Sequence, residues 1–133
     1  MKKRSELREV IMKVLYQISI LEEAKLDYDK KELIKEQLEV ENDFVNTTID
    51  GIINNKKDIV KIANKYLIDW KLDRLNKVDQ AILEIGIYEL MYTETSAVVA
   101  INEAIELSKE YSDEAVTKMI NGVLDKIYHD QEK

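Results

Sequence analysis

The residues of this 133-residue chain best suited to chemistry are cations near its N-terminus, and the chemistry they suit is phosphate binding. The first sixteen residues hold five cations against two carboxylates, a balance of +3: Lys2, Lys3, Arg4, Arg8 and Lys13. Since the net charge of the whole chain is −7, the other 117 residues carry −10. This acidity argues against wholesale nucleic-acid binding, but a basic arm on an acidic body can contact phosphates locally.

Residues for catalysis or metal binding are scarce. The chain has no cysteine and a single histidine, His129, which excludes disulfides, thiol catalysis, thiolate metal sites, histidine triads and multi-histidine sites. A di-metal bundle requires Glu-x-x-His pairs, and the sequence has none, so Glu103 and Glu106 are better explained as a solvated helical face. A glycine-rich phosphate loop and a Gly-x-Ser-x-Gly elbow are also absent. We therefore expect no enzyme, no cofactor and no metal.

Apolar residues recur at helical spacing along nearly the whole chain, and no strand pattern competes with them. We expect one all-α domain over residues 1–133, with about seven helices near residues 7–18, 29–39, 44–53, 59–66, 78–90, 97–111 and 113–127. Ser5 and Ser112 are the expected N-caps of the first and last helices. The fifth helix is apolar on more than one face and should be central, while residues 67–76 should form an ordered turn with its apolar side chains inward.

The three glycines, Gly51, Gly86 and Gly122, fall inside predicted helices, where each costs about 1 kcal/mol relative to alanine. Such glycines usually mark a close approach of another segment, so we expect these helices to cross neighbours tightly. The longest strictly apolar run has five residues, and no apolar segment follows the basic N-terminus. Neither a membrane span nor a secretory signal is expected, which leaves a cytoplasmic protein as the default.

Several sequence strings together carry a family resemblance. Residues 8–9 read RE and residues 15–17 read LYQ, both in the first helix, and residues 75–90 read LNKVDQAILEIGIYEL. Residues 99–107 read VAINEAIEL, and residues 118–125 read KMINGVLD. The last two strings form a specific pair, although either alone would be weak. On these motifs the chain resembles, over its whole length, the NusB family of transcription antitermination factors.

The resemblance implies a fold of two packed helical subdomains, in agreement with the independent helix pattern. It also implies binding of the boxA element of nascent RNA as a heterodimer with NusE, a ribosomal protein that doubles as a transcription factor. The assembly would modify RNA polymerase so that rRNA operons are transcribed through terminators. Neither a cofactor nor catalysis is implied.

The resemblance further assigns RNA contacts to particular residues. The cations that match the family's basic N-terminal region, and would neutralise phosphates, are Lys2, Lys3, Arg4 and Arg8. Tyr16, two helical turns beyond Arg8, would stack on an unpaired base. Lys118 and Met119 match the start of the family's last helix, which flanks the same RNA surface. Two departures from the family would weaken RNA binding: Glu6 interrupts the basic arm, and Met119 replaces an aromatic residue.

The expected contacts with NusE lie on the exposed side of the fifth helix: Glu84, Tyr88 and Tyr92. Glu84 stands where the family often has a basic residue, and an acidic surface suits a basic ribosomal partner.

The strongest motifs also contain residues expected to organise the structure rather than to bind RNA. Asn102 and Asn121 would be buried amides that hydrogen-bond between helices, with Glu89 in the same network. Glu103 belongs to the same motif as Asn102, and Gly122 would allow close helix packing.

Two alternatives remain beside the RNA-binding factor. The first is a protein-interaction module of the same fold with little RNA binding of its own. The second is an rRNA cytosine methyltransferase, because NusB-like domains also occur fused to enzymes of that kind. Because 133 residues leave no room for a methyltransferase domain, we do not expect that activity.

Overall fold

The computed structural model describes residues 2–131 and, within them, contains α-helices and one short 3₁₀ helix but no strand. The elements are α1 (Arg4–Glu23), α2 (Lys30–Gln37), α3 (Asp43–Asn54), α4 (Lys56–Tyr66), η1 (Leu72–Arg74), α5 (Lys77–Tyr92), α6 (Ala97–Tyr111) and α7 (Glu114–Gln131). The seven α-helices of this part of the chain confirm the predicted all-α fold.

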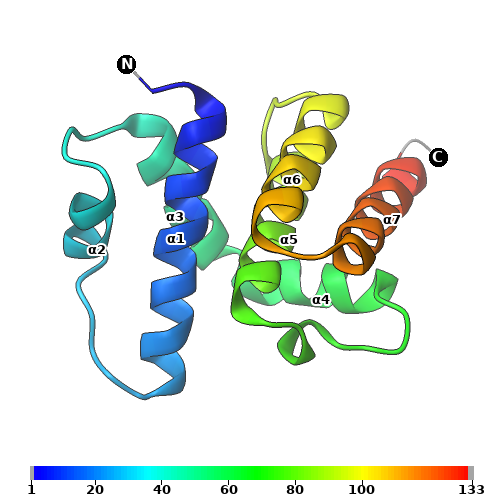
Figure 1. Ribbon diagram of the computed structural model, residues 1–133, viewed down its shortest axis with the longest axis horizontal. Coiled ribbons are helices and arrows are strands. Elements are labelled where there is room, and N and C mark those ends of the chain that lie inside the picture. The colour runs from blue at the N-terminus through cyan, green and yellow to red at the C-terminus, as the bar shows by residue number, and fades with distance from the viewer. Residues whose placement is uncertain (1, 132–133) are drawn as a thin grey trace.

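The helices fall into two groups that meet along α1 and α5 (Figure 1). One group holds α1, α2 and α3, and the other holds α4 to α7. Helix α5 contacts helices of both groups, and every residue from Ala81 to Glu89 is buried. The prediction of a central fifth helix is therefore confirmed, and side chains between Ala81 and Glu89 are largely unavailable to an external ligand.

Polar side chains that accept N–H groups of the first turn define where most helices begin. Asp29, Asn42, Asn76 and Ser96 serve α2, α3, α5 and α6 in this way. The two N-caps predicted from sequence are wrong, because α1 begins at Arg4 with Ser5 inside it, and α7 is capped by the residue after Ser112. The carboxylate of Asp113 accepts the Val116 N–H at 2.9 Å.

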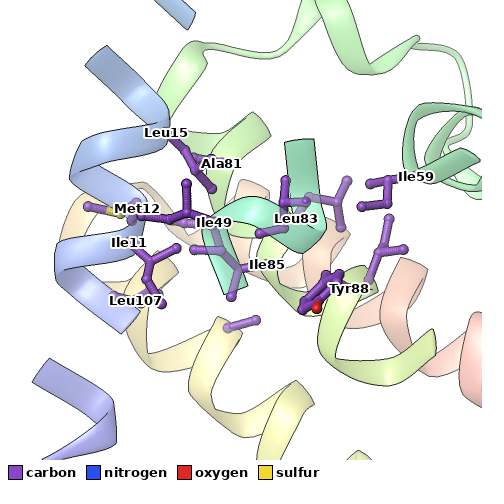
Figure 2. Close-up of a cluster of buried hydrophobic side chains, with 14 of the residues drawn as sticks. Ile11, Met12, Leu15, Ile49, Ile59, Ala81, Leu83, Ile85, Tyr88 and Leu107 are labelled. Atoms are coloured by element: carbon purple, nitrogen blue, oxygen red, sulfur yellow. The ribbon is translucent and has the colours of Figure 1, made fainter. Parts of the chain in front are cut away.

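A continuous apolar core joins the two groups of helices (Figure 2). Figure 2 shows Ile11 of α1, Ile49 of α3, Ile59 of α4, Leu83 of α5 and Leu107 of α6 in this core. All five are buried. Since the core crosses the boundary between the groups, removing large apolar side chains on either side should destabilise the whole molecule.

The connection between α4 and α5 is only partly as predicted. Leu67 and Leu72 are buried, as expected for an ordered turn. Ile68 and Trp70 instead expose 67% and 58% of their surface. The chain adopts a left-handed conformation at Asp69 (φ 70°), between these two residues, and this bend turns both side chains outward.

Two of the three glycines are required by close packing, as predicted, and one is not. A Cβ built on Gly51 would lie 2.1 Å from the hydroxyl oxygen of Tyr88, and one on Gly86 would lie 2.8 Å from Cδ1 of Leu124. A Cβ on Gly122 would meet nothing within 4 Å, and that residue is exposed. The prediction of tight packing at Gly122 is therefore wrong, because the glycine faces solvent.

Alanine substitutions at two of these glycines should have opposite effects on stability. Gly122→Ala should raise the free energy of unfolding by up to about 1 kcal/mol, since alanine favours the helix and its methyl group has open space. Gly51→Ala should lower it by about 1–3 kcal/mol, because the buried ring of Tyr88 would have to move. Urea denaturation followed by circular dichroism measures both. Shifts of the same sign would contradict the packing described at Gly51 or the open space at Gly122.

Candidate nucleic-acid interface

The basic arm leads directly into α1 and carries three consecutive cations: Lys2, Lys3 and Arg4. All three are exposed, and within residues 2–131 none of them forms an ion pair. The carboxylate of Glu6 accepts the backbone N–H of Lys3 at 3.1 Å, so the acidic residue that interrupts the arm helps to start the helix. Within residues 2–131, the structure therefore leaves three exposed cations without an ion pair at the beginning of α1, and the charge of Lys2 acts on Glu9 only over a longer distance.

Arg8 is placed quite differently from the arm. Its side chain is buried, and Nε and Nη2 donate to the carboxylate of Glu89 at 2.9–3.1 Å. Nη1 donates to Glu103 at 2.9 Å, and the hydroxyl of Ser5 donates to the same carboxylate oxygen at 2.6 Å. The expectation that Arg8 is available to a phosphate is wrong, because its donors are occupied inside the protein.

The buried polar network therefore consists of charged residues rather than of amides. Glu89 belongs to this network, but its partner is Arg8 and not the amides of the predicted one. Asn102 and Asn121 are exposed, so the prediction that they organise the core is wrong. Sequence reasoning missed Arg8 although a signal existed: the residue falls in the same helical stripe as Ile11 and Leu15, which are buried.

Tyr16 lies on the solvent face of α1 and exposes 37% of its surface. Glu9 and Lys13 precede it at helical spacing on the same face and form an ion pair at 3.3 Å. Glu9 also accepts the hydroxyl of Tyr111, and this hydrogen bond lowers the pKa of Glu9 and raises the pKa of Tyr111 to about 12. Tyr111 therefore remains a neutral hydroxyl donor that fixes the end of α6 against α1.

Arg4 does not share that face with Tyr16. Its guanidinium carbon lies 4.4 Å from the centre of the Phe44 ring, on α3. With 3.6 residues per turn, Arg4 and Tyr16 project roughly a third of a turn apart around the axis of α1. The arm and the tyrosine thus address two different surfaces of the same helix.

Acidic side chains border the arm on the side of α6. A groove of about 160 Å³ between α1 and α6 is lined by five glutamates: Glu6, Glu9, Glu103, Glu106 and Glu110. Such a groove repels phosphates, so the backbone of an RNA strand bound to the arm would have to run outside this groove.

The two residues predicted on the last helix differ in their availability. Lys118 is exposed, and its only ion pair within residues 2–131 is a solvated one with Glu114 at 3.6 Å. Exposed pairs of this kind contribute little and can be replaced by a phosphate. Met119 is half-buried and packs against the core. Lys118 is available for binding, whereas Met119 is mostly engaged in packing.

The expected partner surface on α5 is largely wrong. Glu84 is buried and forms an ion pair with Lys56, and burial raises the pKa of Glu84 above the usual range of a carboxyl group. Tyr88 is also buried and stacks on Tyr92 with ring centres 5.5 Å apart. Tyr92, which exposes 38% of its surface, is the one member of the predicted trio that faces solvent. Other helices surround α5, which leaves it without the exposed side that was assumed.

Asp79, in the first turn of α5, was missed by sequence reasoning. Its residue surface is only 2% exposed, and Oδ1 has no hydrogen-bond partner within the described part of the chain. Burial raises the pKa of Asp79, and the nearby Asp113 adds to the effect, while a hydrogen bond with the Ser112 side chain opposes it. Asp79 thus joins the start of α5 to the turn between α6 and α7, at a cost in desolvation.

Comparison with known proteins identifies the fold and the family. The model of the NusB family matches residues 5–129. This chain belongs to the NusB family. The transcription antitermination protein NusB of Listeria innocua is 39% identical over 123 residues, which are 92% of this chain and 93% of that protein. The NusB protein of Bacillus subtilis is 37% identical over 134 residues, 98% of each chain.

Solved NusB structures share the same fold. A T. maritima NusB has a TM-score of 0.84 at 30% identity and covers 96% of this chain and 92% of its own. A complex of the antitermination factors NusB and NusE with double-stranded RNA has a TM-score of 0.82 at 26% identity and covers 96% of each chain. The NusB family comprises non-enzymatic antitermination factors, in keeping with the expectation of no enzyme. Over residues 2–131, no helix combines the length and apolar character needed to cross a bilayer.

Removing Arg8 should strongly destabilise the protein. Arg8→Met should lower the free energy of unfolding by about 3–5 kcal/mol, because it leaves the buried carboxylate of Glu89 without a cation. Arg4→Met, on the exposed arm of the same helix, should lower it by no more than about 1 kcal/mol, because only a surface contact with Phe44 is lost. Urea denaturation of both variants tests this difference. If the loss comes from the unpaired charge, the double variant Arg8→Met/Glu89→Gln should recover part of it, and no recovery would contradict this explanation.

Neutralising Asp79 should stabilise the protein in a pH-dependent manner. Because the pKa of Asp79 is higher in the folded state than its unfolded value of about 3.9, its ionisation opposes folding at neutral pH. Asp79→Asn should therefore raise the free energy of unfolding at about pH 7, and the gain should shrink as the pH falls towards about 4. Denaturation curves at several pH values test this, with the exposed Asp73→Asn as control. A gain independent of pH would rule out ionisation as its cause.

Proposed function

We propose that this protein is a transcription antitermination factor that binds boxA-type single-stranded RNA of rRNA operons as a heterodimer with the ribosomal protein NusE. It would act in the cytoplasm within an antitermination complex on RNA polymerase. The observation that carries the proposal is the row of three unpaired cations at the start of α1, in a chain whose structural relatives include a NusB–NusE complex with RNA. Free cations in a row are what a phosphate backbone requires.

The physical contributions of the proposed RNA contacts can be separated. Each phosphate contact made by Lys2, Lys3 or Arg4 releases counterions and adds about 0.7 to the salt dependence of single-strand binding. Tyr16, which exposes 37% of its surface, would stack on a base and contribute about 1–3 kcal/mol without dependence on salt. Lys118 would add a further phosphate contact after exchanging its solvated partner Glu114. Arg8 contributes indirectly, since it holds α1 in place.

For the NusE surface, only Tyr92 of the original candidates remains in the proposal. Its ring is stacked on the buried Tyr88, so it is held in one orientation while its edge stays exposed. Rigid, half-exposed tyrosines of this kind are common anchors in protein interfaces.

A second function is favoured by a separate observation. The groove of five glutamates beside the arm and the sequestered Arg8 both reduce the attraction for phosphates. A protein-interaction module of the same fold, with little RNA binding of its own, would tolerate both features.

Reversing the charge of the arm should distinguish the two functions. Lys2→Glu/Lys3→Glu should weaken binding of a labelled boxA-type RNA and reduce the salt slope of its affinity by about 1.4, because two phosphate contacts are lost. Lys31→Glu/Lys35→Glu, the same change on exposed residues of α2, should leave RNA affinity nearly unchanged. Fluorescence anisotropy at several salt concentrations, with and without NusE, measures both. If NusE binds but neither protein nor complex binds RNA, the interaction module is the correct function.

A further inference from the structure

A second groove lies at the N-terminal end of α1, beside Arg4 and therefore on a different face of the helix from Tyr16. It has a volume of about 480 Å³, within the range of ligand pockets, and combines residues of α1, α3 and the α5–α6 connection. Figure 1 shows α1, α3 and α6 beginning at the same end of the molecule. The groove is lined by Arg4, Asp43, Phe44, Thr47, Thr48, Tyr88, Thr93, Glu94 and Thr95.

One wall of this groove is formed by Arg4 and Phe44, which together are called the Arg4–Phe44 platform. The guanidinium of Arg4 lies over the ring of Phe44, 4.4 Å from its centre, and Arg4 is itself exposed. The guanidinium carbon of Arg8 lies 5.4 Å from the centre of the same ring, but Arg8 forms ion pairs with Glu89 and Glu103. Arg4 has no carboxylate partner among residues 2–131, so its guanidinium contacts Phe44 while the residue stays exposed to solvent.

The polar groups around the platform include one hydroxyl and two carboxylates that line the groove, beside a turn held by its own hydrogen bonds. The Thr93 hydroxyl donates to the Glu89 carbonyl at 2.8 Å and accepts the Thr95 N–H at 3.2 Å, which fixes the turn between α5 and α6. The hydroxyl of Thr47 has no partner within the described chain and is free to bind a ligand. Asp43 and Glu94 supply carboxylates that accept N–H groups and repel phosphates.

We propose that this groove binds one base of the single-stranded RNA, stacked on the Arg4–Phe44 platform, while the adjoining phosphates lie outside along Lys2 and Lys3. Base stacking on an arginine plane and hydrogen bonding to base edges are the usual means of reading an unpaired nucleotide. The two carboxylates favour a base with an exocyclic amino group and exclude the backbone from the groove. The proposal rests on the RNA binding proposed above and extends the RNA path from Tyr16 to a second face of α1, roughly a third of a turn away.

The experiment combines a charge-conserving variant with changes in the RNA. Arg4→Lys keeps the positive charge and removes the stacking plane, with Arg74→Lys, at an exposed position of η1, as the matched control. Anisotropy is measured with a boxA-type RNA and with a series in which each nucleotide in turn is made abasic. Arg4→Lys should lower the affinity about fivefold or more without changing the salt slope, and Arg74→Lys should not. At one RNA position, loss of the base should weaken wild-type binding but leave Arg4→Lys unaffected.

Other outcomes overturn the assignment. If Arg4→Lys binds RNA with wild-type affinity, or if both proteins lose equal affinity at every abasic position, no base binds in the groove. If Arg4→Lys and Phe44→Leu weaken NusE binding and leave RNA binding intact, the groove is a protein docking site. Phe44→Leu is compared only after its melting temperature shows that it folds. Because Lys2→Glu/Lys3→Glu tests RNA binding independently, failure of the groove and failure of the proposed function give different results.

Discussion

The ion network of Arg8 with Glu89 and Glu103 is the constraint on which the rest of the structure depends. One guanidinium, buried with one carboxylate and close to a second that is partly exposed, joins α1 to both α5 and α6. The charges lose their hydration on burial, and only this geometry, with three hydrogen bonds to one carboxylate and one to the other, compensates for it. The network therefore fixes how the two groups of helices meet.

This fixed position of α1 divides the charges of the N-terminal segment into two sets. Arg8 is buried and paired with two carboxylates. Outside this network, the exposed Lys2, Lys3 and Arg4 form no ion pair within residues 2–131. Arg4 is turned towards Phe44, and Tyr16 faces solvent on a different side of the helix. A ligand that uses both must wrap around α1, which a flexible single strand can do.

Much of the fold could be predicted from sequence because helical periodicity is a local property. The bounds predicted for the sixth helix match α6, and the apolar character of the fifth helix correctly indicated its central place. The site was predicted less well. Glu84 and Tyr88 are predicted on a surface, yet they lie in the stretch of α5 from residue 81 to 89 in which every residue is buried. Asn102 and Asn121 are predicted in the core, yet both are exposed.

The sequence by itself determined the helices, the family and the basic character of the arm, because these depend on residue type and on spacing along the chain. Only the tertiary structure decided which charges are available. Arg4 and Arg8 are one helical turn apart and chemically the same, but one meets two carboxylates from residues more than 80 positions away and the other meets an aromatic ring at the surface. Such partners are set by packing between distant segments, which local patterns do not encode.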